Sequence, residues 1–173
     1  MFEDEVIFQV SGSTMRSWAV KGVGATVNSL PGRSSMKALG AVTAESNPRF
    51  HFRFAPVFNQ ETFEAFLRQI IRQYPKTKIH MVLDNVRYHH AKRLQTWLKT
   101  QKKRIELHFL PAYSPQFNPI DKVWKATKKA SIHNRFFQNT DHLHATIFRR
   151  FNRFQGNPCS LRGIMRSYVP DKL

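Results

Sequence analysis

Cysteine, acidic residues and long apolar runs are all scarce in this sequence. Its 173 residues include a single cysteine, Cys159, which excludes an internal disulfide and any zinc site built from several cysteines. No apolar run approaches the roughly 20 residues that a membrane-spanning helix needs. The opening MFEDEVIFQV is acidic where a signal peptide is basic. We therefore expect a soluble, intracellular protein of the reducing cytoplasm.

The shortage of acids leaves a large positive charge. Lys and Arg number 28 against 11 Asp and Glu, which gives a formal net charge of +17. This charge exceeds what solubility requires and predicts a polyanionic partner. Nucleic acid is favoured over a membrane surface because the basic residues are spread through every segment and no helix has a purely cationic face. A basic surface without any partner is the alternative.

The length and the hydrophobic pattern predict one α/β domain over residues 1–173. The first third has strand patterns, in the order 6–10 and 15–22 as a hairpin, then 36–44 and 49–57. The rest predicts, in turn, a helix over 59–74, a strand over 78–84, a helix over 90–100, a strand over 104–111, a helix from 118 and a helix over 140–155. This order suits a mixed sheet with antiparallel first strands, flanked by helices.

Three of the acids stand at the ends of predicted elements. Asp4 immediately precedes a strand, Asp84 ends one, and Asp121 opens a helix. Element ends meet at the edge of a sheet, where α/β proteins build their sites. Three carboxylates at one place suit Mg²⁺ and two-metal phosphoryl transfer. On a very basic protein, this chemistry indicates cleavage or joining of nucleic-acid strands.

Asp84 and Asp121 each have a purely structural alternative. Asp84 in LDN can end its strand in an Asx turn, although its apolar approach favours a metal ion or a Lys or Arg partner. Asp121 falls at the third helical position if Asn118 is the N-cap, so it can interact with the helix dipole. Lys125 and Lys128 share the helical face of Asp121, which favours a role beside a nucleic-acid backbone.

Long segments resemble a known family. VLDNVRYHHAK and IELHFLPAYSPQFNPIDKVW resemble the catalytic core of DDE transposases of the insertion-sequence-630 and mariner group, and FEDEVIFQVSGSTMRSWAVKG resembles the first catalytic strand and the Trp-containing hairpin after it. The resemblance implies a ribonuclease-H-like fold of the retroviral-integrase superfamily. It also implies Mg²⁺-dependent cleavage of DNA at transposon ends and strand transfer into target DNA, with Mn²⁺ able to substitute.

The resemblance assigns the site residue by residue. Asp4 of EDE, Asp84 of LDN and Asp121 of NPID are then the catalytic residues and the metal ligands. The bacterial group usually has Glu at the third position, whereas mariner relatives have Asp. The predicted DNA contacts are Lys125, Lys128, Lys129, Arg87 and His89.

The resemblance also implies partners. Helix-turn-helix modules that read the transposon ends normally precede this core and are absent from the chain, so we expect a DNA-reading part that is encoded separately, as a partner, or joined by frameshifting. End pairing favours a homodimer, and DNA binding favours association with the nucleoid. Two alternatives remain. One is a non-catalytic DNA-binding remnant in which Asp4 lies on a frayed terminus. The other is a ribonuclease-H-like nuclease, which the YSPQFNPID block disfavours.

Overall fold

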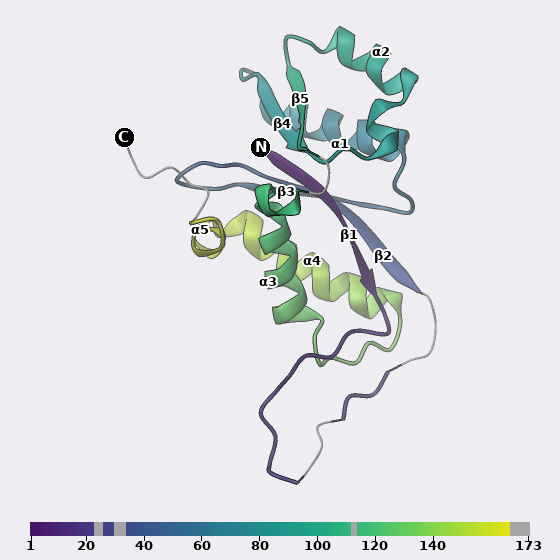
Figure 1. Cartoon of the computed structure of the whole chain (residues 1–173), viewed down its shortest axis with the longest axis vertical. Helices are drawn as coiled ribbons and strands as arrows, with labels where there is room; N and C mark the ends of the chain where they lie inside the picture. The colour runs from purple at the N-terminus through teal and green to yellow at the C-terminus, as the bar shows by residue number, and fades with distance from the viewer. Residues whose placement is uncertain (23–25, 30–33, 112–113, 167–173) are drawn as a thin grey trace.

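A five-stranded mixed sheet runs through the described part of this computed structural model, which covers residues 1–22, 26–29, 34–111 and 114–166 (Figure 1). The strands are β1 (Phe2–Gln9), β2 (Ser35–Val42), β3 (Phe50–Ala55), β4 (Ile79–Leu83) and β5 (Ile105–Phe109). Their order in the sheet is β3-β2-β1-β4-β5. β1, β2 and β3 pair antiparallel, whereas β4 and β5 are parallel to β1 and to each other. The predicted mixed sheet is therefore confirmed.

The helices begin and end near the residues that the sequence indicates. They are α1 (Gln60–Gln73), α2 (Lys92–Thr100), α3 (Ile120–Ser131), α4 (Thr140–Gly156) and α5 (Cys159–Met165), with short 3₁₀ helices η1 (Arg87–His90) and η2 (Pro115–Phe117). Asn59 caps α1 by accepting hydrogen bonds from the amides of Glu61 and Thr62. α5 was not predicted. Within the described ranges, no helix is both long and apolar enough to cross a membrane.

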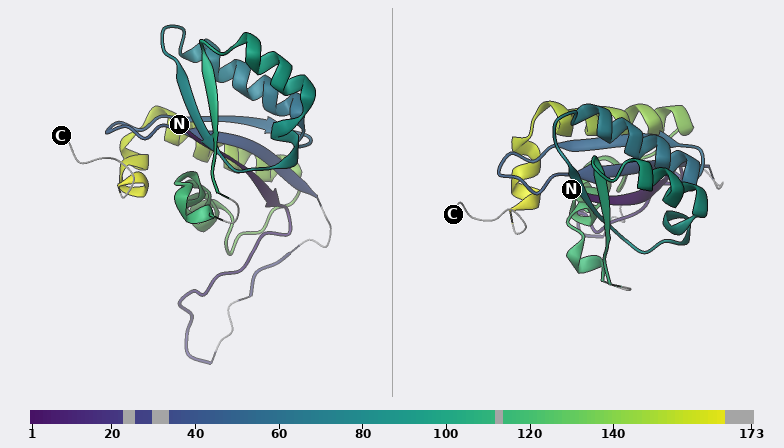
Figure 2. Two further views of the ribbon diagram at one scale, coloured as in Figure 1. Left: turned by 45° about the horizontal axis from the view of Figure 1, so that its top comes forward. Right: turned by 90° about the horizontal axis from the view of Figure 1, so that it is seen from above.

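Helices cover both faces of the sheet, and β2 shows why. Ala38 and Val42 belong to the core beneath α3 and α4, while Leu39 and Ala41 belong to the core beneath α1. Alternate residues of a strand point to opposite faces, so a strand that is apolar at successive positions needs cover on both sides. Figures 1 and 2 show α3, α4 and α5 on one side and α1 and α2 on the other.

The predicted hairpin between 6–10 and 15–22 is wrong. The antiparallel partner of β1 is β2, in a register that places Gly40 opposite Asp4. The described residues of 15–22 form no strand, and the side chain of Trp18 is fully exposed. β2 occupies the position beside β1 because it is apolar on both faces, whereas the 15–22 segment carries charges and all of its residues are exposed.

One buried polar pair leads to a prediction on stability. His51 Nε2 and the Tyr74 hydroxyl are 2.8 Å apart. Burial, with a further contribution from the charge of Arg49, lowers the pKa of His51 from 6.5 to about 4. The unfolded chain therefore binds more protons between these values, and stability falls as the pH drops from 6.5 to 4. We expect this group to contribute about 3 kcal/mol to that fall.

The measurement is urea unfolding at several pH values for the wild type and His51→Gln. The difference between the two curves isolates His51, because all other titrating groups are common to both proteins. We expect the variant to lose less stability than the wild type on acidification. Parallel curves across this pH range would show that His51 is not held neutral by the fold.

Candidate active site

The register of two parallel strands brings Asp4 and Asp84 together. Phe2 of β1 lies opposite Val82 of β4, and each aspartate follows two residues later. Residues at equal offsets in parallel strands lie side by side and point to the same face. One carboxylate oxygen from each of Asp4, Glu5 and Asp84 lies within 4.8 Å of the others. Two of the three predicted site residues thus converge, and Glu5 joins them.

Asp4 is held from the side of α3. Its Oδ2 accepts a hydrogen bond of 3.0 Å from Trp124 Nε1. Burial raises the pKa of Asp4 to about 7, with further increases from the charges of Glu5 and Asp84, while hydrogen bonds from the Glu5 amide and Trp124 oppose the shift. Crowded carboxylates resist ionisation together unless a cation neutralises them. The chemistry of this group therefore fits a divalent metal ion.

Asp121 lies in the first turn of α3 and has a different partner. Its Oδ2 is 2.6 Å from Lys125 Nζ. α3 packs on β1, so Asp121 is on a helix that borders the site. Among the described residues, however, it belongs to none of the groups of three metal-binding side chains gathered within 4.8 Å. Its role as third ligand remains a prediction.

The predicted cap of α3 is wrong. The N-cap position is held by Pro119, where no side chain accepts a hydrogen bond. Asn118 instead is buried, and its Nδ2 donates a hydrogen bond of 2.8 Å to the backbone oxygen of Glu3. This bond ties the NPID segment of the sequence to β1 just before Asp4. Asn118 therefore positions the acidic strand rather than starting the helix.

The structure also reveals residues that the sequence analysis passed over. Glu3 and Glu5 flank Asp4; the side chain of Glu5 is 10% exposed and Glu3 is fully buried. Successive side chains of a strand point to opposite faces, so three consecutive acids place at least one carboxylate on each face. In a chain with 11 acids, the EDE triplet was the signal that both faces of β1 carry charge.

The predicted DNA contacts divide into exposed and buried residues. The side chain of Lys125 is 75% exposed. Arg87 and Lys129 are also exposed, and Lys128 is half-buried. His89 is the third residue of η1 and is fully buried, which does not favour the predicted contact with DNA. Its ring faces Glu5 and Asp84, at 3.4 Å and 3.7 Å from their carboxylate oxygens.

The start of β1 is docked in the sheet. The Met1 ammonium donates to the His80 carbonyl at 2.7 Å, and the Val82 amide donates to the Met1 carbonyl at 2.8 Å. The expectation that Asp4 lies on a frayed end is therefore wrong.

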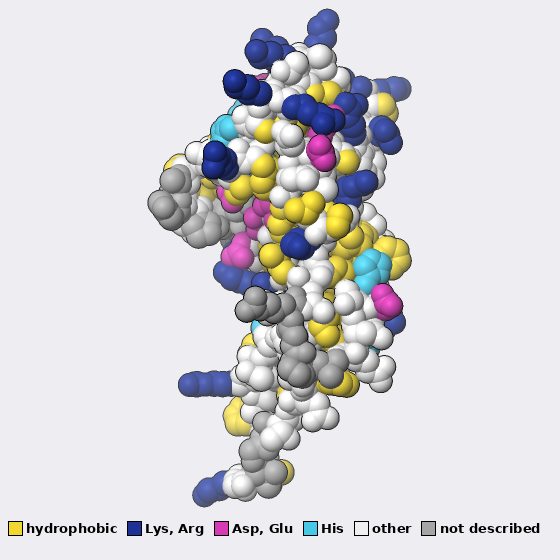
Figure 3. Space-filling view, turned by 90° about the vertical axis from the view of Figure 1, so that its right-hand side faces the viewer, with side chains coloured by type: hydrophobic (Ala, Val, Ile, Leu, Met, Phe, Trp, Pro, Cys, Tyr) yellow, Lys and Arg dark blue, Asp and Glu magenta, His cyan; other side chains and the backbone are white. Residues whose placement is uncertain are grey.

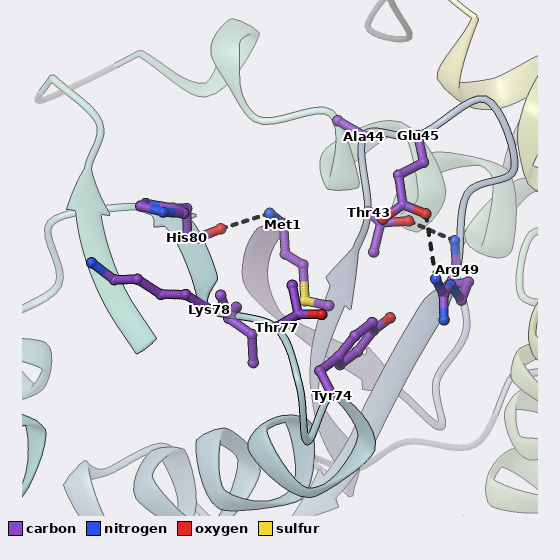
Figure 4. Close-up of a pocket in the computed structure, with 10 residues that line it drawn as sticks. Met1, Thr43, Ala44, Glu45, Arg49, Tyr74, Thr77, Lys78 and His80 are labelled. Carbon is purple, nitrogen blue, oxygen red and sulfur yellow. Dashed lines mark hydrogen bonds and ion pairs between the residues drawn. The ribbon is translucent and has the colours of Figure 1, made fainter. Parts of the chain in front are cut away.

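Figure 4 shows Met1 and His80 at one wall of a pocket whose lining includes none of the site acids. The acids lie instead on β1, the central strand of the sheet, and directly after β4.

The surface carries the excess charge over a wide area. On the face in Figure 3, Lys and Arg side chains project at several heights, with few acidic side chains among them. Scattered cations of this kind contact phosphates without reading a base sequence. This distribution fits the nucleic-acid partner inferred from composition.

A mixed sheet in this strand order, with acids brought together on β1 and after β4, defines the ribonuclease-H-like class of nucleic-acid-processing folds. Within that class, residues 1–144 match the family described as "DDE superfamily endonuclease". The match covers most of the chain, and the chain belongs to this family. The predicted fold and family are confirmed.

Relatives and solved structures agree with this assignment. The chain is 24% identical over 126 residues to "Insertion element IS630 uncharacterized 39 kDa protein" of Shigella sonnei, covering 72% of the chain and 36% of that protein. The pre-cleavage Mos1 transpososome matches with a TM-score of 0.64 and 18% identity, over 97% of this chain and 54% of that one. The catalytic domain of Mos1 mariner transposase matches with a TM-score of 0.60 and 14% identity, over 97% and 79%. The chain thus spans about a third of the insertion-element relative and half of the transpososome subunit.

Proposed function

We propose that this chain is the catalytic domain of a transposase, which cuts DNA at transposon ends and joins the freed 3′ end to target DNA. The observation that carries the proposal is the convergence of Asp4 and Asp84 from two parallel strands. Membership of the DDE endonuclease family and the fold shared with Mos1 support it. The charge of +17 supports DNA as the substrate.

The residues fall into roles. Asp4 and Asp84 would hold the metal ions, with Asp121 as the third ligand. Mg²⁺, or Mn²⁺ in its place, supplies Lewis-acid activation of the attacking oxygen and stabilisation of the leaving oxygen. Trp124 orients Asp4 through the bond from its indole nitrogen.

DNA binding in this proposal uses exposed cations around the site. Lys125, Lys128, Lys129 and Arg87 contact the phosphate backbone. A homodimer pairs two transposon ends, and a separately encoded helix-turn-helix partner reads their sequence. The protein then acts on DNA at the nucleoid.

The test is nicking of a labelled DNA duplex during titration with Mg²⁺ or Mn²⁺. We expect nicking that depends on the metal and stops with EDTA, and DNA binding that weakens steeply between about 50 mM and 200 mM salt. Binding without cleavage at any metal concentration would favour a non-catalytic remnant. Cleavage of branched DNA or hybrids in preference to duplex transposon ends would favour a ribonuclease-H-like nuclease.

A further inference from the structure

A second group of ionisable side chains lies beside the predicted catalytic acids. One ligand atom from each of Glu3, Glu5 and His89 lies within 4.8 Å of the other two. Glu3 and Glu5 alternate with Asp4 along β1, so they leave the strand on the opposite side from Asp4. Their neighbours across the sheet, Ala41 and Leu39, belong to the core beneath α1. This second group is therefore enclosed by the other half of the protein.

The second group holds polar atoms that the fold leaves without hydrogen bonds. In the described part of the chain, the buried atoms without a partner include both carboxylate oxygens of Glu3, Oε1 of Glu5 and Nε2 of His89. Glu3 and His89 are fully buried. Each unsatisfied buried polar group costs about 1–3 kcal/mol, and charged groups cost more. A single ion bound among them would satisfy all three side chains.

The orientation of His89 indicates which kind of ion fits. Its Nδ1 lies 3.3 Å from the Asp84 backbone oxygen, and a carbonyl can only accept, so Nδ1 is the donor. In the tautomer that carries its proton on Nδ1 alone, the lone pair of Nε2 points towards Glu5. Histidines that bind metals have this arrangement, in which the second ring nitrogen donates to a carbonyl or carboxylate.

The spacing also fits a metal ion. His89 Nε2 and Glu5 Oε1 are 3.4 Å apart. Two ligands at about 2.1 Å from one ion, in tetrahedral geometry, are separated by about 3.4 Å. In the tautomer protonated only at Nδ1, Nε2 and an ionised Glu5 carboxylate are both electron-pair donors to a metal, so a cation between them makes the contact favourable.

We propose that Glu3, Glu5 and His89 bind one divalent cation of the zinc or manganese class, at a structural site on the α1 side of β1 that adjoins the group of Asp4 and Asp84 and shares Glu5 with it. An imidazole with two carboxylates suits these metals better than Mg²⁺, which prefers oxygen ligands and water. The two carboxylates balance the charge of the ion. Bound there, it joins β1 to η1 and fixes the segment that carries Asp84. The site does not require that the chain cut DNA.

A surface group of His80, Glu106 and His108 must be separated from this site in any metal titration. Its ligand atoms also gather within 4.8 Å, and His80 Nδ1 is 2.9 Å from His108 Nε2. All three residues are exposed, and Glu106 is already paired with Lys78 at 2.6 Å. The surface group therefore lacks the unsatisfied buried atoms of the Glu3 group, and we remove it in the test by His80→Gln.

The experiment uses the full chain carrying Asp4→Asn, Asp84→Asn and His80→Gln, which removes two acids of the proposed catalytic group and one ligand of the surface group. Calorimetric titration with Zn²⁺ and with Mn²⁺ is expected to show one bound ion, accompanied by a higher melting temperature. Adding Glu3→Gln or His89→Gln is expected to weaken binding by at least about tenfold. Melting of the metal-free variants checks that each one folds.

Pulsed electron paramagnetic resonance gives a readout that needs no change at His89. Mn²⁺ bound to the triple variant is expected to show coupling to one imidazole nitrogen. Absence of a bound ion, absence of nitrogen coupling, or unchanged affinity in Glu3→Gln would each overturn the proposal. In those cases Glu3 holds a proton instead, and the metal ions belong to the catalytic acids alone.

Discussion

Replacing Asp84 with asparagine is expected to reduce metal-dependent DNA cleavage by about a thousandfold or more, equivalent to about 4 kcal/mol of transition-state stabilisation. Asparagine keeps the shape of the side chain and removes its charge, so the acidic group loses one of the two aspartates that the parallel register brings together. Asp84 is 48% exposed, so the change should not disturb the core. Cleavage rates at saturating Mg²⁺ and melting temperatures are the measurements.

Asp141→Asn is the matched control. Asp141 is an exposed acid in the first turn of α4, and the same loss of charge there should leave cleavage unchanged. Asp121→Asn then decides the third ligand: a loss as large as that of Asp84→Asn would place Asp121 in the site. Cleavage that persists in Asp84→Asn at the wild-type rate would remove Asp84 from the proposed mechanism.

Gly40→Ala is expected to destabilise the protein by about 1–3 kcal/mol, because it overpacks the core directly beneath the site. A Cβ on Gly40 would lie 2.3 Å from Cη2 and 2.7 Å from Cζ2 of Trp124. The indole cannot move aside easily, because Phe50 and Phe151 pack against it with ring centroids at 5.9 Å and 5.8 Å. Displacing it also strains its hydrogen bond to Asp4. Chemical unfolding and cleavage assays should both show a loss.

Gly156→Ala provides the control for Gly40→Ala. Gly156 is the last residue of α4, and no atom lies within 4 Å of a Cβ placed there. The free energy of unfolding should therefore change by less than about 0.5 kcal/mol in Gly156→Ala. Trp124→Phe removes the two atoms that clash. In that background, Gly40→Ala should cost less than in the wild type. Equal costs in the two backgrounds would show that Trp124 is not the residue that excludes a side chain at Gly40.

The sequence predicted the elements well where the apolar spacing was regular. The 59–74 pattern became α1 because Asn59 caps it and Pro75 follows it, and both signals act locally. The strand predicted over 15–22 is wrong because strand pairing depends on which segments compete for the same neighbour, and here the competitor lies far along the chain. Nothing within that segment shows that β2 offers β1 two apolar faces.

The same division holds for the site. Asp4 and Asp84 could be predicted because each stands beside a recognisable strand and matches a family motif. The roles of Asn118 and His89 could not, because their partners are Glu3, Glu5 and Asp84, which lie in other segments of the chain. Local sequence patterns predicted Asn118 as a helix cap and His89 as a DNA contact. In the structure, both residues support the acidic strand.

By itself the sequence determined the charge, the absence of disulfides, the order of most elements and the family, since these depend on composition and on contacts between near neighbours. The tertiary structure alone decided which acids meet. The parallel register of β1 and β4 brings Asp4 beside Asp84, α3 aims Trp124 at Asp4, and the alternation of β1 turns Glu3 and Glu5 towards His89. These outcomes depend on how segments about 80 and 120 residues apart pack, and packing is set by the whole chain.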